Sequence, residues 1–174
     1  EPVLRTELGE ERLAELEVMP ESLAAASLGQ VHRARRKRDG RELCIKIQYP
    51  GIAEAVDSDL NTVGTMLMFS RMLPAGFNLQ ELLAEVRGML RQEVDYRQEL
   101  ASVQRFRELL AGDDRYRVPE PFPEYSTQRV LTLSYEPGLP VESMEIQALD
   151  LSRRNRLGEA ALDLFLRSFL EWGF

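Results

Sequence analysis

The sequence lacks the residues that build disulfide frameworks and structural zinc sites. Its 174 residues include one cysteine, Cys44, and one histidine, His32. No disulfide can form within the chain, and a zinc site needs more thiol and imidazole ligands than these. A single free cysteine fits a reducing compartment. We expect Cys44 to be a small buried hydrophobe and His32 to be a structural residue of a strand, and we assign no metal ligand.

Long apolar runs and an excess of positive charge are also missing. No run approaches the roughly 20 residues of a membrane-spanning helix, and the N-terminus carries no signal-peptide pattern. Lys and Arg total 22 against 29 Asp and Glu, a net charge of −7, which argues against a nucleic-acid-binding protein. The basic run 33–38 is a local exception that we interpret as a solvated hairpin tip. With 44% hydrophobic residues, the chain has enough apolar material for a folded core.

The spacing of apolar residues predicts an α+β fold, in which a small antiparallel sheet is backed by a long helix. The predicted strands are 31–36 and 42–49, joined at Asp39-Gly40, and 128–135. The predicted helices are 10–16, 52–73, 79–110 and 151–172. As one unbroken helix, 79–110 would be about 48 Å long.

Two charged residues stand in apolar surroundings. Lys46 lies in the middle of a strand, where an amine is costly to bury unless it is paired. The alternative is an edge-strand lysine that deters aggregation. Glu93 lies on or beside the apolar stripe of the predicted long helix, and its alternative is a boundary glutamate that points to water. We expect the two to pair, because a Lys–Glu ion pair between sheet and helix orients the phosphate-binding lysine of protein kinases.

A run of small residues precedes the hairpin. Small side chains let a backbone approach phosphate groups closely, although a helix start or a tight packing contact would also explain them. The run consists of Ala24, Ala25, Ala26, Ser27, Leu28 and Gly29. The order of loop, hairpin and lysine strand is the layout of a kinase nucleotide lobe.

In this order and spacing, the segments resemble the UbiB-type atypical kinases, whose nucleotide loop carries alanines in place of glycines. The resemblance covers nearly the whole chain and is closest to the branch that supports ubiquinone biosynthesis. The matching segments are the alanine-rich loop 24–32, the lysine strand 45–51, the helix motif 93–99, the strands around 118–119 and 126–132, and the hinge 135–138.

The resemblance implies a role for each matching position. Lys46 would contact the α- and β-phosphates and pair with Glu93, while residues 24–29 would cover the nucleotide. The adenine would meet the backbone of the hinge at Ser134, Tyr135 and Glu136. Glu99 matches the family's second helix glutamate, which is associated with an N-terminal Lys-x-Gly-Gln motif that does not occur in this sequence.

The same resemblance implies a kinase-like nucleotide-binding N-lobe over 1–136, and the hinge and start of a helical C-lobe over 137–174. The cofactor would be ATP or ADP with Mg²⁺, whose ligands we expect outside this chain. The family's catalytic loop and Asp-Phe-Gly-like motif should follow Phe174, so we expect this chain by itself to be inactive. The parent would act inside the cell, on the cytoplasmic or organelle-matrix side of a membrane surface, with isoprenoid lipids or quinone-biosynthesis proteins as partners and no nucleic acid.

Two other functions stay open at this point. One is a non-catalytic nucleotide-binding scaffold or regulatory protein that recruits partners through its long helices. The other is a helical interaction module without a nucleotide, for which the substitution Lys46→Ala would leave ATP binding unchanged.

Overall fold

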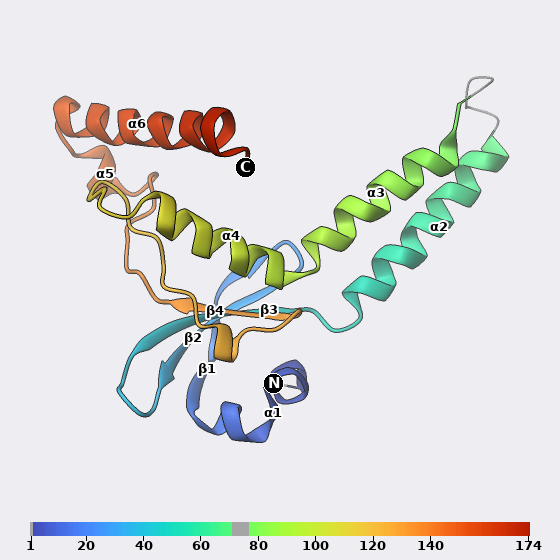
Figure 1. Ribbon diagram of the computed structural model, residues 1–174, viewed down its shortest axis with the longest axis horizontal. Coiled ribbons are helices and arrows are strands. Elements are labelled where there is room, and N and C mark those ends of the chain that lie inside the picture. The colour runs from blue at the N-terminus through green and yellow to red at the C-terminus, as the bar shows by residue number, and fades with distance from the viewer. Residues whose placement is uncertain (1, 71–76) are drawn as a thin grey trace. The chain divides into compact units, whose positions relative to one another are not determined.

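The computed structural model describes residues 2–70 and 77–174 (Figure 1). The chain divides into two units, which are described separately below. The first comprises Glu1–Ala111 and Val118–Tyr135, and the second comprises Gly112–Arg117 and Glu136–Phe174. The predicted α+β class is confirmed.

The first unit is built on an antiparallel sheet of four strands in the order β1-β2-β3-β4 (Figure 1). The strands are β1 (Leu16–Ala26), β2 (Gly29–Arg36), β3 (Glu42–Gln48) and β4 (Val130–Ser134). The three predicted strands are therefore confirmed, whereas β1 was not predicted, and the small residues 24–26 that end it were expected to form a loop. Pro20 is tolerated because β1 is an edge strand whose register shifts between Val18 and Ser22, so that no ladder donor is required there.

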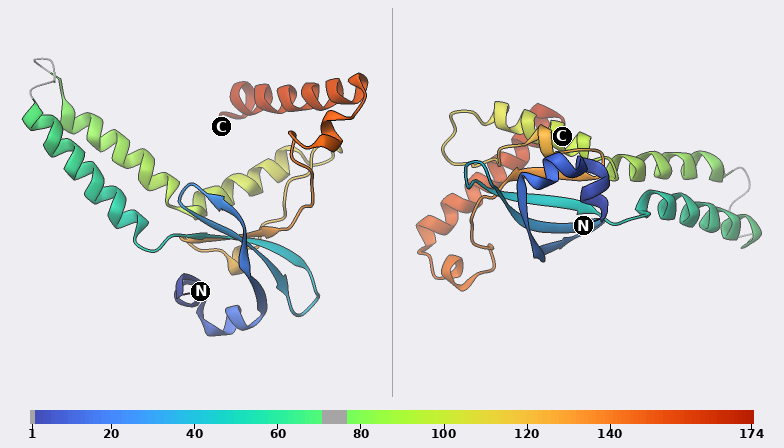
Figure 2. Two further views of the ribbon diagram at one scale, coloured as in Figure 1. Left: turned by 180° about the vertical axis from the view of Figure 1, so that it is seen from behind. Right: turned by 90° about the horizontal axis from the view of Figure 1, so that it is seen from below.

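Two elements cover opposite faces of this sheet, α1 (Pro2–Ala14) on one face and α4 (Tyr96–Leu109) on the other (Figure 2). The α1 side holds the apolar core, to which α1, all four strands and the 3₁₀ turn η1 (Pro123–Tyr125) are adjacent. Its members are Val3, Leu4, Leu8, Leu16, Ala34, Leu43, Ile45, Phe122, Tyr125 and Val130. A polar contact also holds α1 in place, because Glu7 of α1 forms an ion pair with Arg129 at 2.7 Å.

The basic run 33–38 lies at the β2–β3 hairpin, as predicted, and its arginines pair with carboxylates. Arg35 bonds Glu17 across the β1–β2 pair at 2.7 Å, and Arg36 bonds Asp39 at 2.6 Å. The Arg36 guanidinium holds the pKa of Asp39 down at about 2.

The predicted long helix 79–110 is wrong in one respect, since it is broken into α3 (Leu79–Glu93) and α4. At the break, Val94 is buried and its carbonyl oxygen accepts a hydrogen bond from Gln48 Nε2 at 2.8 Å. The Tyr96 N–H donates to the carbonyl oxygen of Gln128 at 2.9 Å. The first unit thus satisfies backbone groups that a continuous helix would have paired internally.

Asp95 begins α4 as its N-cap, because its carboxylate accepts from the Arg97 N–H at 3.1 Å. We expect Asp95→Ala to lower the free energy of unfolding by about 1 kcal/mol, the usual effect of removing such a cap. Urea denaturation would measure it, with Asp59→Ala on the exposed side of α2 as the matched control. Equal stabilities of the two variants would contradict the capping role.

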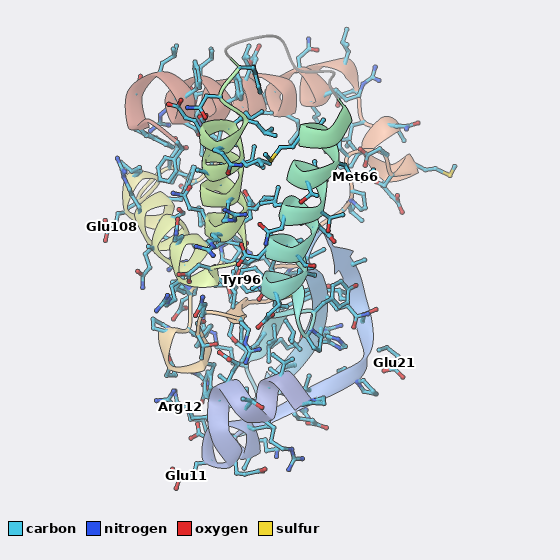
Figure 3. The ribbon with its side chains drawn as sticks, turned by 90° about the vertical axis from the view of Figure 1, so that its right-hand side faces the viewer. Glu11, Arg12, Glu21, Met66, Tyr96 and Glu108 are labelled. Atoms are coloured by element: carbon cyan, nitrogen blue, oxygen red, sulfur yellow. The ribbon has the colours of Figure 1, made fainter. Side chains whose placement is uncertain are left out.

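A helical hairpin is formed by α2 (Ile52–Ser70) and α3. The helix predicted over 52–73 is confirmed as far as residue 70, and 71–73 lie outside the described residues. Gly64 allows close packing, since an added Cβ would lie 2.6 Å from Leu83 Cδ1. Asp57 in α2 bridges Arg87 and Arg91 in α3 at 3.2 and 2.9 Å. Figure 3 shows Met66 on this hairpin and Tyr96 near its base.

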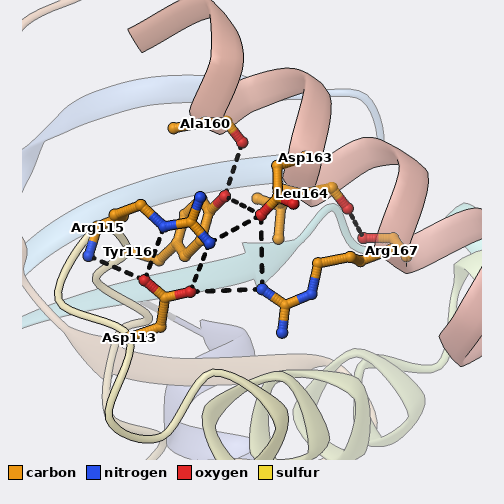
Figure 4. A network of polar contacts seen from close by, with 8 residues as sticks. Asp113, Arg115, Tyr116, Ala160, Asp163, Leu164 and Arg167 are labelled. Carbon is orange, nitrogen blue, oxygen red and sulfur yellow. Dashed lines mark hydrogen bonds and ion pairs between the residues drawn. The ribbon is translucent and has the colours of Figure 1, made fainter. Parts of the chain in front are cut away.

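The second unit contains α5 (Met144–Gln147), α6 (Leu151–Leu166) and a π-helical continuation, η2 (Arg167–Trp172). The predicted helix 151–172 is confirmed. A polar network joins the turn 112–117 to α6 (Figure 4). Arg115 bridges Asp113 and Asp163 at 2.8 and 2.9 Å, and the Tyr116 hydroxyl donates to Asp163 at 2.8 Å. The Arg115 guanidinium lowers the pKa of Asp113 to about 2.

Candidate functional site

Lys46 lies on the face of β3 that α4 covers. Its Nζ is 2.6 Å from Glu99 Oε2 and 4.6 Å from the centroid of the Tyr96 ring. The Lys46 side chain is 26% exposed and that of Glu99 is 43% exposed, so both ends of the ion pair reach water. An amine fixed between a carboxylate and an aromatic face has a defined position and still has room for a further anionic ligand.

The predicted partner of Lys46 is corrected by this geometry. Glu93 is exposed at the last turn of α3 and does not pair with Lys46, which bonds Glu99 of α4 instead. The reason is the break at Val94 and Asp95, which ends α3 before the chain reaches the sheet. Glu99 then lies one turn after Tyr96 and shares the side of α4 that faces Lys46.

Tyr96 was missed by sequence reasoning. Its side chain is 2% exposed, and its hydroxyl is one of the buried polar atoms without a hydrogen-bond partner among the described residues. Burial first, and the Glu99 carboxylate second, raise the pKa of Tyr96 to about 12. The ring therefore stays neutral and provides a flat surface beneath the Lys46 ammonium. The signal that could have found it is its place directly after the capping aspartate.

The small residues form the tip of the β1–β2 hairpin. Ala24 pairs with Val31 and Ala26 with Gly29, and the turn falls at Ser27 and Leu28. Ala24, Ala25 and Ser27 are exposed, so a tight packing contact does not explain them. Gly29 differs, because it is buried and an added Cβ would lie 2.2 Å from the Ile47 carbonyl oxygen. Its missing side chain is thus required by the β2–β3 pairing.

The predicted hinge residues fall at the end of β4. Ser134 is buried, and its N–H donates to the Glu120 carbonyl oxygen at 2.8 Å. The Tyr135 N–H donates to the Glu42 carbonyl oxygen at 3.1 Å. These two donors are therefore occupied within the first unit. Glu136 belongs to the second unit, where it lies 3.6 Å from Arg117.

Cys44 lies two residues before Lys46 on the same face of β3, opposite Arg33 of β2. It is half-buried rather than fully buried, and burial raises the pKa of its thiol. Arg33 lies 4.4 Å from the Tyr135 ring centroid and pairs with Glu42. The face that carries Lys46 therefore also carries a second cation, which is already held by a carboxylate and a ring.

The groups on this face are of kinds that bind anionic ligands. Lys46 supplies a positioned cation, and the exposed hairpin tip 24–28 supplies small side chains near a backbone turn. In residues 2–70 and 77–174, no three Asp, Glu, His or Cys side chains cluster as metal ligands would. The same ranges contain no helix that is long and apolar enough to cross a membrane.

A four-stranded antiparallel sheet, with a strand lysine held by the glutamate of a crossing helix, defines the N-terminal lobe of a protein-kinase-like fold. The comparison with solved structures agrees. The chain is similar to Rv3197 of Mycobacterium tuberculosis, solved as a complex with erythromycin, with a TM-score of 0.72 and 31% identity over 90% of this chain and 39% of that one.

The chain belongs to the ABC1 atypical kinase-like domain family, whose model matches residues 1–174. It is 40% identical to the mitochondrial atypical kinase COQ8B of Rattus norvegicus, over 99% of this chain and 32% of the relative. It is also 40% identical to the mitochondrial atypical kinase COQ8 of Schizosaccharomyces pombe, over 87% of this chain and 24% of the relative. The resemblance derived from the motifs is thereby confirmed. The chain spans about a quarter to a third of the length of these relatives.

Proposed function

We propose that this chain is the nucleotide-binding part of an atypical kinase or ATPase that supports the biosynthesis of ubiquinone or a related isoprenoid quinone. The observation that carries the proposal is the ion pair between Lys46 and Glu99, which lies on the same unit as the exposed small-residue hairpin. Neither feature is needed for the apolar core, which lies on the opposite face of the sheet.

In the proposed complex, the Lys46 ammonium contacts the α- and β-phosphates, while Glu99 and the Tyr96 ring hold it in place. The hairpin tip at 24–29 covers the phosphates, and the adenine lies toward the backbone of residues 134 and 135. Mg²⁺ supplies charge neutralisation when it is bound, through ligands that we expect outside these 174 residues. The chain by itself then binds nucleotide without turning it over.

The proposal extends to the setting of the whole protein. The first unit corresponds to the N-lobe, and the second to the start of a helical C-lobe. The names of two relatives place them in mitochondria. We infer an intracellular protein that acts at a membrane surface, on the cytoplasmic or organelle-matrix side, with isoprenoid lipids or quinone-biosynthesis proteins as partners.

Calorimetric titration of the purified chain with ATP and with ADP, each with and without Mg²⁺, tests the proposal. We expect saturable binding of one nucleotide per chain without release of phosphate. The absence of binding at millimolar nucleotide would overturn it.

The partner of Lys46 gives a sharper test. We expect Glu99→Gln to weaken ATP binding about fivefold to tenfold, because the charge-assisted bond that positions the amine becomes a weaker neutral one. Glu93→Gln is the matched control, since Glu93 is exposed and lies outside the ion pair. The same titration compares them, and an equal loss in both variants would contradict the assignment of Glu99.

A further inference from the structure

A cavity of about 560 Å³ lies between α1 and the strands β1, β2 and β3. Ile47 lines this cavity, whereas its neighbour Lys46 projects to the other face of β3. Figure 2 shows α1 and α4 on opposite faces of the sheet, so the cavity beneath α1 is on the reverse of the sheet from Lys46. Among the residues that the structure describes, the side chains that line the cavity are apolar, including those of Leu13, Val18 and Met19, apart from that of His32.

The cavity follows from an irregularity in β1. Val18 pairs with Ala34 and Ser22 pairs with His32, so residues 19–21 of β1 lie opposite Arg33 alone in β2. Pro20 sits in this bulge and has no N–H to donate to the ladder. A bulge of this kind bends its strand away from its neighbour, and here it leaves space beneath α1.

His32 takes over one of the hydrogen bonds that the bulge removes. Its Nδ1 lies 3.0 Å from the carbonyl oxygen of Met19. A carbonyl oxygen can only accept, so Nδ1 must carry the proton. In the neutral ring the other nitrogen, Nε2, is then a hydrogen-bond acceptor. The described part of the lining thus offers apolar side chains and one side-chain acceptor.

We propose that this cavity binds a small apolar molecule that bears one hydroxyl group, whose O–H donates to His32 Nε2. The volume falls within the range of small-molecule sites, and an apolar wall with one orienting polar group is their usual construction. In residues 2–70 and 77–174, no charged side chain lines the cavity, so a charged ligand would lose hydration without compensation from these side chains. The lining contains neither Lys46 nor Glu99, so this site does not depend on the proposed nucleotide function.

The test uses the imidazole of the chain's single histidine, whose ¹⁵N resonances therefore need no assignment. The whole chain is titrated at pH 8 with 2-phenylethanol and with ethylbenzene. We expect the alcohol to bind about fivefold to tenfold more tightly than the hydrocarbon, and to shift the Nε2 resonance, because it adds one hydrogen bond. Equal affinities, an unshifted Nε2, or no binding of either compound would overturn the proposal.

A substitution that fills the cavity provides a second test of the proposed site. We expect Val18→Phe to abolish binding of 2-phenylethanol, because the larger side chain occupies the space. Val63→Phe is the matched control, since Val63 is 47% exposed on α2, and it should bind as the parent chain does. If Val18→Phe does not fold, nuclear Overhauser contacts between the alcohol and the Val18 methyl groups replace it. Contacts to residues outside the cavity would then refute the site.

Discussion

Replacing Lys46 with alanine is expected to weaken ATP binding about 30-fold to 100-fold without unfolding the chain. The loss corresponds to one charge-assisted hydrogen bond to a phosphate oxygen, worth about 1.5–3 kcal/mol. The fold should survive because the Glu99 side chain left behind is 43% exposed and remains hydrated. Calorimetric titration measures the first effect, and urea denaturation the second.

The chain supplies its own control for this substitution. Lys37 is the other of its two lysines, and its Nζ donates to the carbonyl oxygen of Ala14 at 2.7 Å on the exposed end of the β2–β3 hairpin. Lys37→Ala removes the same charge and leaves Lys46 in place, so ATP binding should be unchanged. If Lys46→Ala bound ATP as tightly as Lys37→Ala, Lys46 would not contact the phosphates and the proposed nucleotide site would be wrong.

The position of Lys46 was predictable because it depends on local periodicity. Leu43, Ile45 and Ile47 alternate with Cys44, Lys46 and Gln48, and a strand sends these two sets to opposite faces. The structure buries Leu43 and Ile45 completely in the core and leaves Lys46 on the α4 side. The alternation of apolar and other residues in one strand therefore predicted which of its side chains enter the core and which face of the sheet carries Lys46.

The partner of Lys46 was not predictable in the same way, because the helix break depends on distant residues. The apolar stripe of 79–110 runs through Val94 without interruption, and aspartate alone does not end a helix. The helix ends here because Gln48 Nε2 of β3 donates to the Val94 carbonyl oxygen, and because the Tyr96 N–H donates to the Gln128 carbonyl oxygen. Both partners are more than 30 residues away, so no local pattern indicates that Glu99 replaces Glu93.

Strand β1 escaped prediction for a related reason. Its residues are largely exposed and include Pro20, so it shows neither the alternation nor the composition of a strand. It forms because β2 offers an unpaired edge and because the bulge places Pro20 where no donor is needed. Tertiary pairing thus overrides a weak local preference, and the same bulge opens the cavity behind the sheet.

The second large effect is expected from Gly29→Ala, which should lower the free energy of unfolding by about 2–4 kcal/mol. The new Cβ would lie 2.2 Å from the Ile47 carbonyl oxygen and 3.1 Å from the Gln48 Cα, both of them backbone atoms of β3. Backbone atoms cannot rotate away as a side chain can, so β2 and β3 must separate where Gly29 pairs with Gln48. Urea denaturation of the purified variant gives the loss directly.

Gly88→Ala in α3 should change stability in the opposite direction. Nothing lies within 4 Å of a Cβ added at Gly88, and alanine is favoured over glycine inside a helix by about 0.5–1 kcal/mol. Comparing Gly29→Ala with Gly88→Ala also distinguishes between two explanations for the glycine at position 29. If the glycine served only the approach of phosphate, Gly29→Ala would weaken ATP binding at unchanged stability. A large loss of stability in the absence of ATP, beside a gain in Gly88→Ala, would instead assign Gly29 to the pairing of β2 with β3.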